Sequence, residues 1–311
     1  MDTPHSKRPV FAITGASGLV GTALRRQLDQ DGAQVLRLVR RPPAASDEVQ
    51  WNPKASFSPD QRLEGVDAVI HLAGAGIADR RWTAARREML LRSRVDGTRF
   101  LVEALQQLNA PPATFVQASA IGWYGNRGDE ILSEGATRGT GFLAGLAYAW
   151  EQAGEPIERV GARRVSLRMG MVVSDSGGAL ARMKPVFRCG LGGRLGNGRQ
   201  WVSWIALADL VDIILRSCRD ATLSGPVNAV SPYPVTNRIF TKALAHAWRR
   251  PAVLPAPSWA LQLMLGGMAS ELLLSSQRCI PGILEELGHR FAKSSLPEAL
   301  KPAPSLILPL L

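Results

Sequence analysis

The sequence has few cysteines, no long apolar run and no basic tail, and each absence excludes a class of protein. Its 311 residues include three widely separated cysteines, Cys189, Cys218 and Cys279. None forms a Cys-x-x-Cys pair, so we expect neither a zinc site nor a disulfide framework. No apolar run reaches the roughly 18–20 residues that cross a bilayer, and the polar N-terminus lacks the apolar core of a signal peptide. We therefore expect a cytoplasmic protein with no metal site and no membrane partner.

The net charge is +11, and most of the basic residues are arginine. Such a balance can indicate nucleic-acid binding. The arginines, however, occur in short scattered groups, such as Arg25-Arg26 and Arg249-Arg250, and no basic run is interleaved with aromatic residues. A basic surface that attracts a polyanionic cofactor is the simpler interpretation, and we expect no nucleic-acid partner.

The most informative segment lies near the N-terminus, where a short apolar run leads into a loop with three glycines and then directly into a helical stretch over 19–28. This order is typical of the turn that binds the pyrophosphate of a dinucleotide on bare backbone N–H groups. Spaced glycines alone are a weak signal, and a plain strand-to-helix turn is the alternative. The residues expected to contact the cofactor here are Gly15, Ser17, Gly18, Leu19, Val20 and Gly21.

Apolar runs alternate with helical patterns through the first two-thirds of the chain. We predict strands over 10–13, 35–39, 66–72, 114–118 and 164–173, and helices over 94–108 and 142–153. This alternation predicts an α/β fold with a Rossmann-like, doubly wound parallel sheet. Later segments are a glycine-rich loop over 190–198, helices over 208–217 and 237–248, a strand over 227–230 and a proline-punctuated helical region over 251–291.

The predicted division of the chain follows from this pattern. A nucleotide-binding domain covers 8–175, with returning elements around 203–230. A smaller and mostly helical substrate-side lobe covers 176–300, and an apolar, proline-rich tail covers 301–311.

The end of the second predicted strand indicates which dinucleotide is bound. An acid there would bind the ribose 2′-hydroxyl of NAD, whereas an arginine pairs with the 2′-phosphate of NADP. The sequence reads Arg40-Arg41, with no acid before Asp47. We therefore predict NADP(H), with Arg40 as the main contact and Arg41 as the second; two solvated loop arginines are the alternative. After the next strand, Leu72, Ala73 and Gly74 are expected to let the backbone pass close to the adenosine end of the cofactor. His71 is expected to pack against its neighbours.

A series of further motifs is specific in its order and spacing. It comprises Gly15–Gly21, Asp67–Gly74, Arg81–Thr83, Ser93–Val95, Ser119–Gly125, Gly128–Glu130, Phe142–Ala144, Trp150–Glu151, Gly177–Leu180, Gly190–Gly193, Gly198–Trp201, Ser203–Ile205, Gly225–Ala229 and Glu271–Arg278. Through these motifs the chain resembles the extended epimerase/dehydratase division of the short-chain dehydrogenase/reductase superfamily. Within that division it is similar to the branch called epimerase family proteins, which carries a C-terminal domain of unknown function. The resemblance implies NADP(H) binding and an oxidoreductase or epimerase role, and we place Arg94 and Ser119 at the cofactor.

The usual catalytic set of that superfamily is incomplete in this chain. The serine is present as Ser119, at the carboxyl end of a predicted strand. The Tyr-x-x-x-Lys pair is absent, because Tyr148 is followed four residues later by Gln152. A glutamine carries no charge that could lower the pKa of a phenol, so we interpret Tyr148 as a packing residue. Tyr124 is the rival proton donor, with a pocket-lining aromatic as the alternative.

The predicted substrate-side residues lie in and before the glycine-rich loop. Arg199 could bind an anionic substrate, with Lys184 as a second cation, and Trp201 and Trp204 could form the pocket wall. Relatives commonly have a histidine where this chain has Ala206. We carry two hypotheses: an NADP(H)-dependent oxidoreductase or epimerase that acts on an unknown small molecule beside Ser119, and a catalytically silent NADP(H)-binding sensor or scaffold. The oligomeric state is left open, with a homodimer as one alternative.

Overall fold

The computed structural model describes residues 8–301 and confirms the Rossmann-like fold. Its main sheet contains seven parallel strands in the order β11-β7-β5-β4-β1-β2-β3. These strands are β1 (Val10–Thr14), β2 (Gln34–Val39), β3 (Glu48–Gln50), β4 (Ala68–His71), β5 (Thr114–Ala120), β7 (Arg163–Met169) and β11 (Gly225–Ala229). Because β1 pairs with β2 on one side and β4 on the other, the strand order reverses there. A crevice at the carboxyl ends of β1 and β4 is where such sheets bind ligands.

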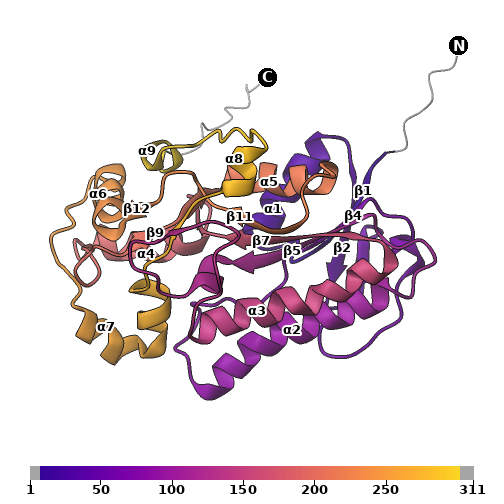
Figure 1. Ribbon diagram of the computed structural model, residues 1–311, viewed down its shortest axis with the longest axis horizontal. Coiled ribbons are helices and arrows are strands. Elements are labelled where there is room, and N and C mark those ends of the chain that lie inside the picture. The colour runs from indigo at the N-terminus through magenta and orange to yellow at the C-terminus, as the bar shows by residue number, and fades with distance from the viewer. Residues whose placement is uncertain (1–7, 302–311) are drawn as a thin grey trace, which may run out of the picture.

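Helices cover both faces of this sheet (Figure 1). One face carries α1 (Leu19–Gln30) and α5 (Leu207–Arg219), and the other carries α2 (Ala84–Leu105) and α3 (Phe142–Gly154). Successive strand residues point to opposite faces, so Ile13 joins the core beneath α1 and α5, whereas Ala12 joins the core beneath α2. Burial on both faces explains why the strands read as continuous apolar runs.

Two predicted elements differ from the observed ones. The strand expected over 164–173 is divided at Gly170 into β7 and β8 (Met171–Val173), and β8 pairs with β10 (Trp204–Ala206) outside the main sheet. The helix expected over 94–108 begins earlier, at Ala84, where the side chain of Thr83 accepts a hydrogen bond from Arg86 N. Its first turns are rich in arginine and glutamate, which obscures the apolar periodicity.

The C-terminal lobe is only partly helical. It contains α4 (Gly178–Arg188), β9 (Trp201–Val202), β12 (Val235–Thr236), α6 (Asn237–Trp248), α7 (Ser258–Leu265), a π-helical turn at Ala269–Leu273, β13 (Arg278–Cys279), α8 (Gly282–Glu286) and α9 (Leu296–Ala299). β13 pairs with β6 (Ile131–Leu132), so the C-terminal region is joined to the nucleotide-binding part by backbone hydrogen bonds. Short 3-10 turns occur at Gln61–Leu63, Ile121–Tyr124 and Glu155–Val160.

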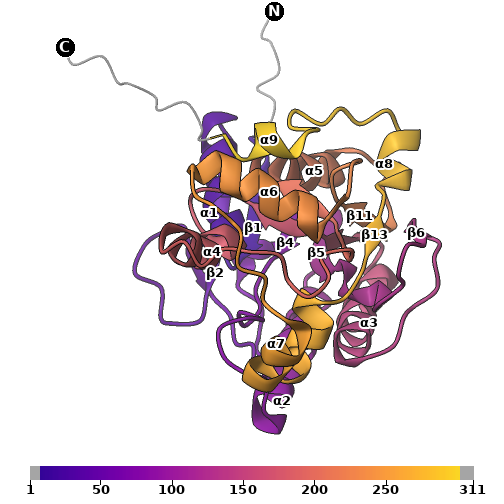
Figure 2. The same ribbon diagram turned by 90° about the vertical axis from the view of Figure 1, so that its left-hand side faces the viewer.

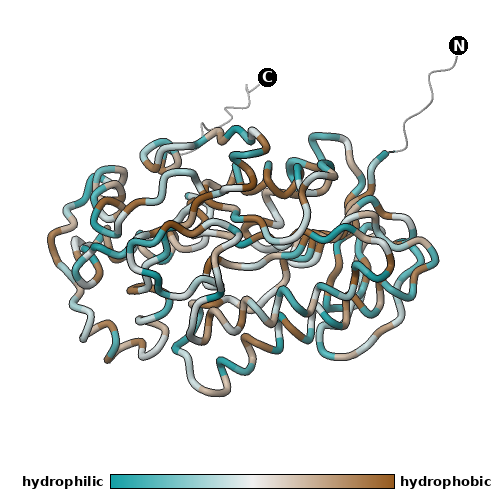
Figure 3. The backbone as a smooth tube through the Cα atoms, in the orientation of Figure 1, coloured by the Kyte–Doolittle hydropathy of each residue, from teal (hydrophilic) through white to brown (hydrophobic). Residues whose placement is uncertain are grey.

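α6 and α7 lie at opposite ends of the lobe (Figure 2). α6 packs in a core with Trp204 and Phe187, whereas α7 exposes Trp259, Leu263 and Met264 to solvent. The hydropathy of the backbone is shown in Figure 3, where brown segments of the chain include parts of the α7 region. No helix within residues 8–301 is long and apolar enough to cross a membrane. All but the first residue of the expected tail lies outside the described residues.

Candidate functional site

The glycine loop has the geometry that a pyrophosphate site requires. Gly15 has a φ of 69°, and its carbonyl accepts a hydrogen bond of 3.0 Å from Gly18 N. A Cβ on Gly21 would collide with that same carbonyl, so only glycine allows the helix to start this close to the strand. Gly18 is the N-cap of α1 and has no side chain to cap it. The first N–H groups of α1 therefore remain available to an anion, which the positive end of the helix also attracts.

The loop after β4 lies against the glycine loop and is held there by a buried histidine. His71 Nδ1 lies 2.8 Å from Thr14 Oγ1, and His71 Nε2 lies 2.9 Å from Thr98 Oγ1. Thr14 Oγ1 also accepts a hydrogen bond of 3.1 Å from Ala73 N. Burial lowers the pKa of His71 to about 3, so the ring is neutral at physiological pH. His71 packs as expected and aligns the two loops.

The two arginines after β2 have different surroundings. Arg41 forms hydrogen bonds of 2.8 and 2.6 Å with the carboxylate of Glu48, which also pairs with Arg37 at 3.1 Å. Glu48 is buried and has two cations beside it, so it is not free to bind a ribose hydroxyl. Arg40 is exposed, and within residues 8–301 its side chain forms no hydrogen bond or ion pair. Of the two expected contacts, Arg40 is the one that is free to bind a phosphate.

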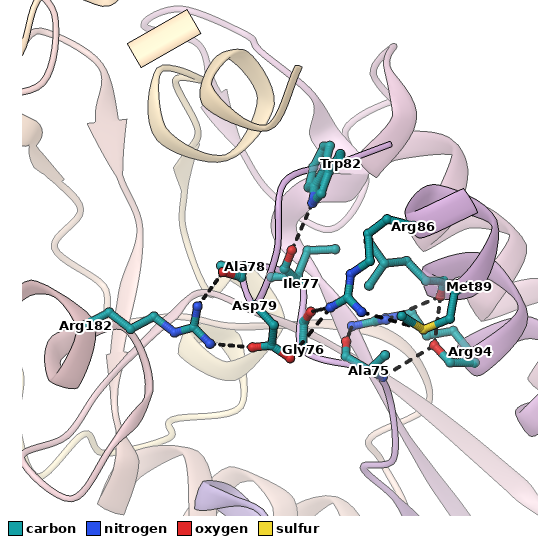
Figure 4. A network of polar contacts seen from close by, with 12 residues as sticks. Ala75, Gly76, Ile77, Ala78, Asp79, Trp82, Arg86, Met89, Arg94 and Arg182 are labelled. Carbon is teal, nitrogen blue, oxygen red and sulfur yellow. Dashed lines mark hydrogen bonds and ion pairs between the residues drawn. The ribbon is translucent and has the colours of Figure 1, made fainter. Parts of the chain in front are cut away.

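Arg94 lies beside the loop after β4 and is bonded to it (Figure 4). It donates a hydrogen bond of 3.0 Å to Ala75 O and one of 3.3 Å to Leu90 O, and its guanidinium lies 4.9 Å from the centre of the Trp150 ring. Burial, together with the nearby charge of Arg86, lowers the pKa of Arg94 to about 10, so it stays charged at neutral pH. Its observed role is to hold the loop beside which a cofactor would lie.

A second arginine joins this loop to the C-terminal lobe. Arg182 of α4 donates to Ala78 O and pairs with the carboxylate of Asp79 (Figure 4). One turn before Arg182, α4 begins beside the glycine loop, because a Cβ on Gly178 would lie 3.0 Å from Leu19 Cδ2. The first part of α4, Gly178 to Arg182, therefore contacts both the start of α1 and the loop after β4.

Ser119 belongs to a buried charged network. Its hydroxyl donates a hydrogen bond of 2.6 Å to Glu151 Oε1. The Glu151 carboxylate receives two further hydrogen bonds, of 2.9 and 3.0 Å, from the guanidinium of Arg168. Burial alone would lower the pKa of Arg168, but its hydrogen bonds and its attraction to Glu151 and Tyr124 raise it. The serine is thus held by an ion pair whose members are only 2% and 5% exposed.

Tyr124 lies in the same network, and its position argues against the expected role of proton donor. Its hydroxyl donates a hydrogen bond of 2.7 Å to Asn228 Oδ1 and accepts one of 3.1 Å from Arg168. The side chain has no exposed surface, and burial raises its pKa to about 12. Asn228 and Arg168 are themselves buried, so the hydroxyl of Tyr124 is not open to solvent. Tyr148 lies on the exposed side of α3, with its ring beside Arg138.

The four expected substrate residues do not share one environment. Lys184 is half-buried on α4, and Arg199 is exposed. Trp201 donates a hydrogen bond of 2.7 Å from Nε1 to Asp129 Oδ1. Trp204 is fully buried in the core of the C-terminal lobe, where its Nε1 donates to Tyr233 O at 3.1 Å. The expectation that Trp204 forms a pocket wall is therefore wrong, because no face of its ring is open to a ligand.

The sequence motifs include Glu151 and Asn228 without fixing a role for either, and they do not include Arg168. Arg168 could have been noticed because it is a charged residue within the apolar part of a predicted strand. A buried charge requires a partner of opposite charge. The partner lies on another element and could not be named from the pattern. Within residues 8–301 the structure contains no group of histidine, cysteine or acidic side chains able to hold a metal ion.

Comparison with known proteins adds to this geometry. The sequence profile of the NAD dependent epimerase/dehydratase family matches residues 11–229, and that of a domain of unknown function, DUF1731, matches residues 256–303. The chain belongs to the NAD dependent epimerase/dehydratase family. An epimerase family protein of Mycobacterium bovis is 46% identical over 291 residues, which are 94% of this chain and 96% of the relative. One from Staphylococcus aureus is 34% identical over 299 residues, covering 94% and 97%.

Solved structures of this family superpose on the chain. The human epimerase family protein SDR39U1 (isoform 2), described as a structure with NADPH, has a TM-score of 0.85 and 29% identity and covers 94% of this chain and 98% of its own. A nucleoside-diphosphate sugar epimerase from Corynebacterium glutamicum has a TM-score of 0.78 and 38% identity, covering 94% and 57%. The family and the fold implied by the sequence motifs are confirmed.

Proposed function

We propose that the protein is an NADP(H)-dependent oxidoreductase or epimerase that moves a hydride to or from a small substrate held beside Ser119. The observation that carries the proposal is the position of the serine. Ser119 is the second-last residue of β5, which lies next to β4 in the sheet, so the serine is at the same carboxyl edge as the glycine loop and the loop after β4. Ligands of parallel sheets bind at this edge.

The residues at the crevice fit NADP(H). The start of α1 offers backbone N–H groups to the pyrophosphate, and Arg40 can form a charge-assisted, bidentate contact with the 2′-phosphate. The buried pairing of Glu48 with Arg41 removes the acid that would favour NAD. The human relative that superposes on this chain is described as a structure with NADPH, which supports the same assignment. When bound, the cofactor supplies or accepts the hydride.

The hydrogen bond that Ser119 donates to Glu151 determines whether its hydroxyl can donate to or accept from a substrate. The proton of its hydroxyl is directed to Glu151, so only the lone pairs of the hydroxyl oxygen remain for a ligand. A hydroxyl in this state accepts a hydrogen bond from a substrate alcohol and does not donate one to a carbonyl. Arg168 holds Glu151 in place and thereby fixes the orientation of the serine. The arrangement favours an alcohol as the bound form of the substrate: its carbon is positioned to release a hydride while its hydroxyl proton passes through Ser119 to the carboxylate of Glu151.

The test is a turnover assay with a panel of alcohols and nucleotide sugars, using NADP⁺ and following absorbance. Ser119→Ala should lower kcat by about 100-fold or more, because positioned proton-transfer groups contribute on that order, and should leave NADPH binding unchanged. Ser224→Ala, an exposed serine that directly precedes β11 at the opposite, amino edge of the sheet, is the matched control. Equal turnover in both variants would remove Ser119 from the reaction.

One observation favours the second candidate, a catalytically silent NADP(H)-binding protein. α3 holds Gln152 four residues after Tyr148, and no lysine occurs among its residues, Phe142–Gly154. No cation on this helix could then lower the pKa of a phenol. Tight NADPH binding in calorimetry, with no turnover of any compound in the panel, would support this candidate over the enzyme.

A further inference from the structure

A small cavity lies between the turn that follows Ser119 and the C-terminal DUF1731 region. Its volume is about 70 Å³. The polar residues that line it come from the nucleotide-binding part and from the DUF1731 region: Asn126 and Thr140 from the first, and Ser270, Glu271, Ser275 and Gln277 from the second. Glu271 is the one ionisable side chain among the lining residues, and the other polar groups are hydroxyls and amides. No expectation from the sequence assigned a role to this cavity.

The cavity adjoins the proposed reaction site. Gly122 and Gly125, in the turn directly after the strand that carries Ser119, form one wall. Leu143, in the first turn of α3, forms another. The same helix carries Glu151, which binds the serine. A ligand that reaches from Ser119 toward the C-terminal region would therefore enter this space.

Glu271 is held firmly in place at the start of α3. Its Oε2 accepts a hydrogen bond of 2.8 Å from Leu143 N, although the two residues are 128 positions apart. Gly141, the N-cap of α3, has a φ of 103°, and a Cβ there would lie 2.9 Å from Glu271 Oε2. The approach of the carboxylate therefore requires glycine at 141. The positive end of α3 stabilises the negative charge.

The second carboxylate oxygen is the one left for a ligand. Glu271 Oε1 forms no hydrogen bond or ion pair with any residue in the described part of the chain, 8–301. The side chain comes from the π-helical turn Ala269–Leu273, a form of helix that is rare and often found at functional sites. An ionised carboxylate only accepts hydrogen bonds. A matching ligand group must donate them and must carry no negative charge.

We propose that this cavity binds one end of the substrate and that Glu271 selects, at that end, a hydrogen-bond donor, either a hydroxyl or an amine, over an anionic group. The inference deepens the proposed function and rests on it for the identity of the reaction. A water molecule occupies about 30 Å³ in the liquid, so the cavity takes a small terminal group and not a whole substrate. Arg199 and Lys184, which were expected to bind an anion, are not among its lining residues.

The test measures binding directly, without turnover. Methyl signals of Leu143 are followed by NMR in NADPH-loaded protein while glycerol, ethanolamine or glycolate is added. These probes are similar in size and carry hydroxyls only, an amine, or a carboxylate. Glycerol and ethanolamine should shift the Leu143 signals and glycolate should not. A response to ethanolamine alone identifies the preferred donor as an amine, and a response to both identifies a hydroxyl as sufficient.

Glu271→Gln retains an oxygen that can accept from Leu143 N and removes the charge. Hydrogen bonds to a charged group are worth roughly ten-fold or more in affinity, so ethanolamine should bind about ten-fold more weakly to this variant. Glu286→Gln, an exposed glutamate of α8, is the matched control and should bind like the wild type.

Three outcomes would overturn the inference: binding of glycolate as tight as that of ethanolamine, unchanged selectivity in Glu271→Gln, or no shift of Leu143 with any probe. The same titrations without NADPH separate this inference from the proposed function. A protein that binds no cofactor but still discriminates among the probes would disprove the proposed function alone.

Discussion

The buried pair of Arg168 and Glu151 should be the most sensitive electrostatic feature of the protein. Its two hydrogen bonds are 2.9 and 3.0 Å long, and the side chains are only 3% and 7% exposed. Arg168→Met would leave the carboxylate of Glu151 buried without its cation. Breaking such a pair by removing one partner costs about 3–5 kcal/mol, because the remaining charge is neither solvated nor neutralised.

That cost is large beside the total stability of an ordinary domain, which is about 5–15 kcal/mol. The assay is equilibrium unfolding in urea, where a lower midpoint at an unchanged slope reports lost stability. Arg92→Met is the matched control, since Arg92 pairs with Glu88 at 2.6 Å but both side chains are more than half exposed. An exposed pair of this kind contributes about 0.3–0.5 kcal/mol, so the control should unfold almost like the wild type.

The double variant Arg168→Met with Glu151→Gln distinguishes loss of the pair from general disruption of the core. Without the carboxylate there is no unpaired negative charge, so the double variant should be less destabilised than the sum of the two single variants. Residues in direct contact usually deviate from additivity by about 0.5–3 kcal/mol. Additive losses, or equal effects of Arg168→Met and Arg92→Met, would refute the reasoning.

Three further predictions concern the nucleotide crevice. Arg40→Asp should weaken NADPH binding by about 10–100-fold through loss of a charge-assisted contact and should change NADH binding much less; calorimetry with both nucleotides checks this, and equal changes would contradict it. The pKa of His71 is lowered to about 3 in the folded state, and the unfolded chain binds its proton near pH 6.5, so stability should fall as the pH drops through that window; urea unfolding of His71→Gln should show a shallower pH dependence. Arg182→Ala should speed NADPH release in stopped-flow fluorescence, because it frees α4 from Asp79; an unchanged rate would show that α4 does not retain the cofactor.

Local patterns predicted the parts of the fold whose interactions are local. The glycine spacing identified the β1–α1 turn, and the helix over 237–248 was placed at its observed bounds. The early start of α2 was missed because its first turns are largely exposed and charged, so no apolar stripe marks them. The break at Gly170 was missed because its cause is distant: Met171 N bonds to Ser203 O, 32 residues along the chain.

Only those parts of the candidate site whose residues all lie in one short segment of the chain could be predicted from the sequence. The glycine loop and the loop after β4 each lie within one short motif, so their positions could be predicted from the sequence. The Ser119 network instead joins β5, α3, β7 and β11, and nothing in the sequence around Arg168 indicates which acid it pairs with. The same limit explains Tyr124 and Trp204, whose burial depends on Asn228 and on the backbone at Tyr233 respectively. Aromatic residues near glycines suggested a pocket, but packing placed both rings in the interior.

Under the proposed function, Ser119 and Glu271 restrict the substrate in the same direction. Ser119 gives its proton to Glu151, and Glu271 has one carboxylate oxygen without a partner among the described residues. Each therefore requires a hydrogen-bond donor from the ligand: Ser119 at the reacting carbon, and Glu271 at the opposite end of the ligand. A compound with a hydroxyl at the first position and a hydroxyl or amine at the second satisfies both groups, whereas a keto acid satisfies neither. If turnover were found with keto acids and not with such alcohols, the orientation of Ser119 in the working enzyme would have to differ from the one that Arg168 and Glu151 impose.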